Sequence, residues 1–216
     1  MSESPLVYLI DDDDDVRASV EALLGSAGIS VRAFPSGAEF LKIAPQLVSG
    51  CVLTDLRMPG IDGIELQERL IKMGIDLPLV MMTGQADVPT AIKALKSGAA
   101  DFIEKPFKKK ALVDSVNAAL EKGFRARQAR AEIAAITTRL NALTQRETEV
   151  LSGLVAGRPN KVIAHQLGMS PRTVEVHRAR IMVKTGADSL SELVRMAMKV
   201  RPEGGNSGGS TMDGGA

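Results

Sequence analysis

Cysteine, aromatic residues and long hydrophobic runs are scarce in this sequence, and each scarcity excludes a class of protein. Cys51 is the only cysteine among 216 residues, so no internal disulfide can form, and we expect a buried, reduced thiol. No stretch approaches the roughly 18 apolar residues of a membrane span, and the N-terminus lacks the basic flank and apolar core of a signal peptide. We therefore expect a cytoplasmic protein without a membrane partner.

The composition that remains is that of an ordinary globular protein. Hydrophobic residues make up 44% of the chain and charged residues 25%, while aromatic residues reach only 3%. The core must therefore be built from Leu, Ile, Val, Met and Ala. A chain of 216 residues is long enough for two compact domains, each with its own core.

Charge is distributed unevenly along the chain. Residues 1–121 carry 12 basic and 18 acidic side chains, whereas residues 122–200 carry 14 basic and 6 acidic ones. The net charge of +1 thus hides an acidic front half and a basic back half. The basic half favours nucleic acid as its partner.

The front half, residues 1–121, alternates short apolar runs with stretches of helical periodicity such as 63–73 and 88–97. The apolar runs are expected to be strands, and they cover residues 6–10, 29–34, 51–54, 78–82 and 100–103. This alternation predicts an α/β fold with a doubly wound, five-stranded parallel sheet. Any ligand site is then expected at the carboxyl ends of the strands.

The back half is expected to be helical. Residues 122–140 fit a helical linker, because the stretch 125–140 is rich in Ala and Arg and lacks Gly and Pro. Residues 141–200 fit a small all-α domain of four helices, with breaks near 157–159, 168–171 and 186–188. The Gly-rich tail, residues 201–216, has no apolar face and is expected to be disordered.

Polar residues follow the predicted strands in an order that suggests one pocket. They are Asp11 and Asp12, Asp55, Thr83 and Lys105. Three carboxylates brought together repel one another, so the cluster requires a cation, either a metal or a lysine. Oxygen-only ligands favour Mg²⁺ over a softer metal. Asp14 and Asp15, in contrast, fit the N-terminal cap of a helix.

These residues closely resemble the receiver domain of two-component response regulators over residues 6–121. The resemblance implies that Asp55 accepts a phosphoryl group from a histidine kinase. It implies that Asp12, the Asp55 carboxylate and the Arg57 backbone carbonyl bind Mg²⁺, and that Asp11 assists through the water shell of the metal.

The same resemblance assigns the residues that respond to phosphorylation. Thr83 is expected to move toward the phosphoryl oxygens, and Phe102 to turn inward with it. Phe102 on its own fits a core position equally well. The peptide bond between Lys105 and Pro106 is expected to be cis, as in the family.

Residues 160–185 carry a helix-turn-helix signature. Asn160 and Lys161 open a short helix, Gly168 ends it, and Ser170 with Pro171 begins the next one. Residues 141–200 resemble the LuxR-type DNA-binding domain, and the pairing with a receiver resembles the FixJ-like regulators. We expect the DNA contacts to come from Lys161, Arg172, Thr173, Glu175, Val176, Arg180 and Lys184.

The resemblance implies a regulator and not an enzyme, apart from slow self-dephosphorylation. Phosphorylation is expected to pair two receivers through the fourth helix and fifth strand, forming a homodimer that controls transcription, with RNA polymerase as a further partner. Two alternatives stay open. A phosphorylation-independent DNA-binding regulator would use the pocket only for interaction. A phosphatase of the haloacid dehalogenase type would use Asp12 as its nucleophile, because residues 12–16 match D-x-D-x-[TV].

Overall fold

A computed structural model describes residues 6–84, 92, 96 and 98–200 of the chain and divides it into two compact units, residues 1–128 and 129–216. The first unit is built on a five-stranded sheet with the order β2-β1-β3-β4-β5, and all of the strand pairs described are parallel. The strands are β1 (Leu6–Ile10), β2 (Ser30–Phe34), β3 (Cys51–Asp55), β4 (Leu79–Gly84) and β5 (Asp101–Lys105).

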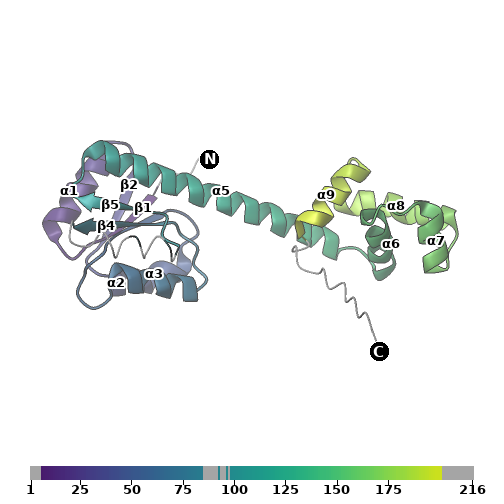
Figure 1. Ribbon diagram of the computed structural model, residues 1–216, viewed down its shortest axis with the longest axis horizontal. Coiled ribbons are helices and arrows are strands. Elements are labelled where there is room, and N and C mark those ends of the chain that lie inside the picture. The colour runs from purple at the N-terminus through teal and green to yellow at the C-terminus, as the bar shows by residue number, and fades with distance from the viewer. Residues whose placement is uncertain (1–5, 85–91, 93–95, 97, 201–216) are drawn as a thin grey trace, which may run out of the picture. The chain divides into compact units, whose positions relative to one another are not determined.

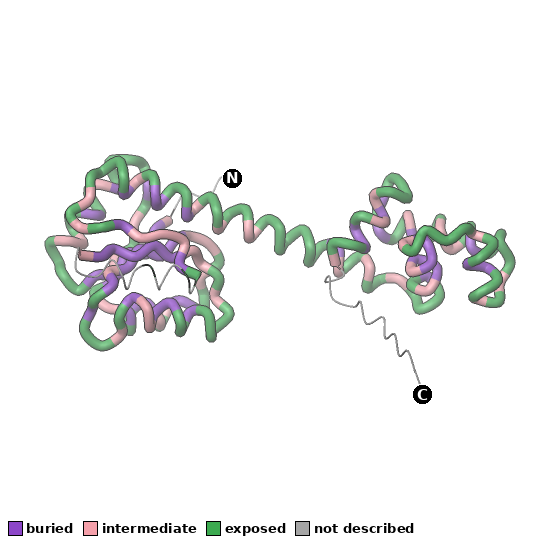
Figure 2. Tube along the Cα trace, in the orientation of Figure 1, coloured by how far each residue is buried: buried purple, intermediate pink, exposed green. Residues whose placement is uncertain are grey.

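Helices cover both faces of this sheet (Figure 1). One face packs against α1 (Asp14–Gly25) and the first part of α5 (Lys109–Asn141). The other face packs against α2 (Gly37–Ile43), the short 3-10 turn η1 (Ala44–Gln46) and α3 (Gly63–Lys72). The central strands are buried on both sides, which is why their sequences are nearly continuous apolar runs (Figure 2).

Alternation along β1 illustrates how the two cores form. Val7 and Leu9 face α1 and α5, whereas Tyr8 and Ile10 face α2 and α3. Cys51, at the start of β3, is fully buried, and burial raises the pKa of its thiol to about 12. The predicted buried, reduced thiol is therefore what the structure contains.

The second unit is helical, as predicted. It contains α6 (Gln145–Val155), α7 (Asn160–Leu167), α8 (Pro171–Thr185) and α9 (Leu190–Val200). The turns between them fall at the predicted breaks. Ile163, Val174, Ile181 and Leu193 form the centre of its core.

The long helix α5 includes residues 122–140, the predicted linker, which are helical throughout. Within the first unit, Gly123 of this helix lies against Pro78, where a Cβ atom would come within 2.9 Å of the proline ring. Within the second unit, Ile136 is buried in the helical core. The compact units divide after Gln128, inside the helix.

Two expected segments lie outside the described residues. The predicted helix over 88–97 falls largely in the undescribed stretch, and the predicted tail, 201–216, falls entirely there. Among the residues that are described, no helix combines the length and apolar character that crossing a membrane requires.

Candidate functional site

The carboxyl edge of the sheet brings the predicted pocket residues together. Asp55 and Lys105 are the last residues of β3 and β5, and Thr83 lies near the end of β4, so these strands extend slightly further than the apolar runs indicated. Asp55 pairs in register with Met82, the neighbour of Thr83. Parallel pairing thus aligns three separate parts of the chain at one edge.

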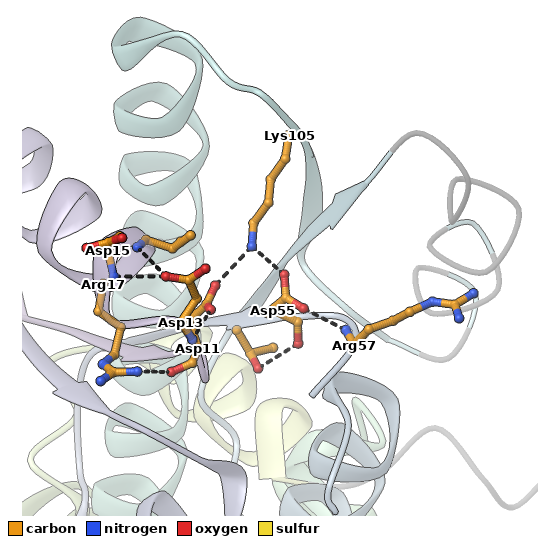
Figure 3. Close-up of polar contacts among 9 residues, drawn as sticks. Asp11, Asp13, Asp15, Arg17, Asp55, Arg57 and Lys105 are labelled. Atoms are coloured by element: carbon orange, nitrogen blue, oxygen red, sulfur yellow. Dashed lines mark hydrogen bonds and ion pairs between the residues drawn. The ribbon is translucent and has the colours of Figure 1, made fainter. Parts of the chain in front are cut away.

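Lys105 joins the two carboxylates of this pocket (Figure 3). Its Nζ atom donates to Asp55 Oδ1 at 2.5 Å and to Asp11 Oδ2 at 2.9 Å. The second oxygen of Asp55 accepts from the backbone N–H of Arg57 at 2.8 Å. The peptide bond between Lys105 and Pro106 is cis, as expected.

Burial opposes the negative charge on Asp55. Its side chain is 15% exposed, and desolvation raises the pKa of its carboxyl more than the hydrogen bond and charge of Lys105 lower it. Burial alone would lower the pKa of Lys105, but its hydrogen bonds to Asp55 and Asp11 together raise it. Lys105 therefore stays charged, and the Asp55 carboxylate is held in a poorly solvated position.

Asp11 is fixed in four directions. Its N–H donates to Phe34 O at 3.3 Å, and its carbonyl accepts from Arg17 Nη1 at 2.6 Å. Its carboxylate accepts from Asp13 N and from Lys105. Asp11 is only 2% exposed, so these bonds set the direction of the carboxylate that faces Lys105.

Arg17 is a pocket residue that the sequence analysis missed. It lies one turn into α1, where its guanidinium reaches Asp11 (Figure 3). Its side chain is 15% exposed, and it also forms an ion pair with Asp14. The signal available was a single cation two residues after the run of five aspartates. Arg17 donates to a backbone carbonyl, which every residue has, so the residue types alone do not indicate this contact.

The remaining aspartates of the run have other positions. Asp12 is exposed. Asp13, and not Asp14 or Asp15, is the N-cap of α1, because its side chain accepts from Asp15 N and Val16 N. Asp14 and Asp15 occupy the first turn, where negative charge is favourable.

Thr83 and Phe102 lie on neighbouring strands. Thr83 is 1% exposed, and its hydroxyl donates to Gly84 O at 3.1 Å. Phe102 is partly buried and packs against the core on the α2 and α3 face. Their predicted movement on phosphorylation stays a prediction.

Gly63 shapes the floor of the pocket. A Cβ atom at this position would lie 2.6 Å from Asp55 O, so only glycine lets α3 approach the end of β3 this closely. Asp62 caps the helix by accepting from Glu65 N at 2.8 Å.

The donor chemistry of the pocket suits a hard cation. Asp11 and Asp55 supply carboxylate oxygens, which are the ligands that Mg²⁺ prefers. Within the described residues, however, no three His, Cys, Asp or Glu side chains gather closely enough to hold a metal ion. Asp12, a predicted ligand, is exposed, and its role stays a prediction.

The second unit has the predicted helix-turn-helix geometry. Gly168 ends α7 with φ 66°, a left-handed conformation that favours glycine. Ser170 caps α8 by accepting from Thr173 N at 3.1 Å, and Pro171 is the first residue of the helix.

The face of α8 opposite the core is exposed. Val174 and Ile181 point inward, whereas the predicted contact residues lie on the surface. These exposed residues are Lys161 on α7 together with Arg172, Thr173, Glu175, Val176, Arg180 and Lys184 on α8. Their contacts with DNA stay predictions.

Lys184 differs from the other predicted contacts because its ammonium is already paired. It donates to Glu147 Oε2 at 2.7 Å and to Ala142 O at 3.3 Å. Glu147 is only 2% exposed. The hydrogen bond from Lys184, with that from Thr144 N, lowers the pKa of the Glu147 carboxyl to about 2.

Comparisons with known proteins agree with both units. Residues 7–117 match the response regulator receiver domain, and residues 141–197 match the bacterial regulatory proteins of the luxR family. The transcriptional regulatory protein FixJ of Azorhizobium caulinodans is 50% identical over 200 residues, which cover 92% of this chain and 94% of that protein. FixJ of Bradyrhizobium diazoefficiens is 46% identical over 193 residues, which cover 89% of this chain and 94% of that protein.

Solved structures give the same picture. A low-resolution structure of the response regulator StyR matches with a TM-score of 0.81 at 40% identity, covering 91% of this chain and 99% of that chain. Full-length FixJ from B. japonicum matches with a TM-score of 0.57 at 45% identity, covering 91% and 97%.

Proposed function

Because the chain belongs to the two-component response regulators that join a receiver domain to a LuxR-type DNA-binding domain, we propose that Asp55 is its phosphoacceptor. As a member of this family it is a transcription factor and not an enzyme of the usual kind, and its partners are a sensor kinase and DNA. The observation that carries the proposal is the Asp55 carboxylate, poorly solvated and in contact with Lys105.

In the proposed reaction, an Asp55 carboxylate oxygen attacks the phosphorus of a kinase phosphohistidine. The new O–P bond forms as the N–P bond breaks, and the electron pair of that bond leaves with the imidazole. Burial destabilises the carboxylate charge and so favours attack, while Lys105 opposes the rise in the pKa of Asp55 and can follow the charge onto the phosphoryl oxygens.

Receiver domains generally bind Mg²⁺ at the phosphorylation site. In this chain the proposed ligands are Asp12, the Asp55 carboxylate and the Arg57 backbone carbonyl, with Asp11 acting through water. The metal, when bound, supplies positive charge to the phosphoryl oxygens. Slow self-dephosphorylation of Asp55 belongs to the same proposal.

Phosphorylation then controls DNA binding. The proposal is that Thr83 and Phe102 change position, that two receivers pair, and that two copies of α8 read a two-fold DNA site. Two half-sites neutralise more phosphates than one, so a dimer binds more tightly. RNA polymerase is the proposed further partner at the promoter.

The test is the intact mass of the full chain after incubation with acetyl phosphate and Mg²⁺. Wild type should gain one phosphoryl group, and Asp55→Asn should gain none. Labelling of both proteins would place the nucleophile elsewhere, with Asp12 the first candidate. Labelling of neither would favour a phosphorylation-independent regulator. The mass of the labelled protein in solution then tests the dimer, which an unchanged monomer would exclude.

A further inference from the structure

The helical unit contains a basic groove that lies beside the exposed face of α8. Arg158 lines it from the turn before α7, Lys161 from the first turn of α7, and Arg178 from α8. Its volume is about 620 Å³. Among the described residues that line it, Glu175 is the only acid, so the groove is set up to hold an anion.

The guanidinium groups of the groove are held in place by neutral partners. Arg178 Nη1 donates to Asn160 Oδ1 at 3.1 Å, and Arg158 Nη1 donates to Gln166 Oε1 at 2.5 Å. Neither hydrogen bond neutralises the charge, because both acceptors are amide oxygens. This differs from Lys184, whose charge is compensated by Glu147.

The end of α7 adds to the positive character of the groove. Pro159 occupies the N-cap position, and no side chain in the described part of the unit caps this helix. Asn160 and Lys161, the first two residues of α7, line the same groove as Arg158, so the positive end of the helix dipole lies beside it.

We propose that this groove binds a phosphodiester of the DNA backbone, with Arg158 and Arg178 as its ligands, neither of which belongs to the predicted contact set. The inference rests on the proposed DNA-binding function. Pro171 lines the groove and precedes Arg172 on the exposed face, so a duplex lying along α8 would bring its backbone to the groove. Because it contacts phosphate alone, the groove adds affinity without sequence preference.

The test measures binding of the full chain to a short duplex of arbitrary sequence over a series of KCl concentrations. Arg158→Gln and Arg178→Gln should each weaken binding and reduce the slope of log affinity against log salt by about 0.9 per lost phosphate contact. Arg146→Gln is the matched control, because it removes the same charge from an exposed site on α6 outside the groove.

The slope separates the outcomes. A slope equal to that of Arg146→Gln would overturn the proposal. Weaker binding with an unchanged slope would show that the arginines support the fold instead of contacting phosphate, and would overturn it as well. Failure of the wild-type chain to bind DNA, phosphorylated or not, would reject the proposed function and the groove with it. Thermal melting of each variant confirms that the compared proteins are folded.

Discussion

Lys105 in the first unit and Lys184 in the second each pair with a carboxylate that is largely or fully buried. The pKa values of these two carboxyl groups are nevertheless shifted in opposite directions. Burial raises the pKa of Asp55 despite its lysine, whereas the hydrogen bond from Lys184 lowers the pKa of Glu147 to about 2. The difference lies first in burial: desolvation is the largest influence on the pKa of Asp55, whereas the hydrogen bond from Lys184 is the largest influence on the pKa of Glu147. Lys105 is also shared between two carboxylates, Asp55 and Asp11, while Lys184 pairs with the single carboxylate of Glu147.

This contrast separates the pair that is proposed to react from a pair with a structural role. Glu147 completes a capping box with Thr144 at the start of α6. It also accepts from Lys184 near the end of α8, so its carboxylate links the two helices. The pKa of Asp55 stays raised despite Lys105, and in the proposed reaction Lys105 moves toward the arriving phosphoryl group. A lysine paired with a carboxylate thus ties two helices together in the second unit, whereas in the first unit such a pair lies at the site proposed for phosphorylation.

The largest effect is expected from Lys105→Met, which removes the shared cation. The rate of acetyl phosphate labelling should fall by roughly 100-fold or more, because charge on the phosphoryl oxygens loses its protein partner. Intact mass over time measures the rate. Lys110→Met, at an exposed lysine paired with Asp114, is the control. An unchanged rate would mean that Lys105 is structural like Lys184.

Glu147→Gln should weaken the structural pair between Glu147 and Lys184. It should lower the thermal midpoint of the helical unit while leaving the labelling of Asp55 intact. Loss of a helix cap alone lowers the midpoint of a domain this size by roughly 4–8 °C. Loss of labelling together with stability would contradict the division between the two pairs.

Acid should weaken the same pair. The folded pKa of Glu147, about 2, lies below the unfolded value of about 4.3. Its stabilisation is therefore present above the unfolded value and is lost as the pH falls toward 2. The stability difference between wild type and Glu147→Gln should shrink over that range. Asp55 contributes with the opposite sign, since its folded pKa is raised.

The smallest effect is expected from Arg17→Met, which removes the donor to the Asp11 carbonyl. Labelling should slow by several fold, because the Asp11 carboxylate loses one of the bonds that fix its direction. Arg17→Gln keeps a donor and should lose less. Asp14→Asn removes only the exposed partner of Arg17 and should label like wild type. Equal labelling of Arg17→Met and wild type would show that the other three bonds suffice.

The sheet and most of the pocket were predictable because they follow from local patterns. Apolar runs bounded by polar residues gave the strands, and parallel strands must bring Asp55 and Lys105 to one edge. The turns of the helical unit were predictable from Gly168 and Ser170 for the same reason.

Other contacts could not be predicted because their partners leave no signal in the sequence. A helical wheel places Lys184 on the surface of α8, but only the fold reveals Glu147, 37 residues earlier. Arg17 was missed because a backbone carbonyl carries no sequence signature. Asp13 was passed over as the cap because five adjacent aspartates offer equivalent alternatives.

The buried thiol of Cys51 has a practical consequence. A thiol reagent attacks the thiolate, and this thiol is fully buried, with its pKa raised to about 12. The folded protein therefore offers no reactive thiol to maleimides or iodoacetamide. A single cysteine introduced on α8 would therefore be labelled selectively with a fluorophore. Its fluorescence would then show whether the surroundings of α8 change when the full chain is treated with acetyl phosphate.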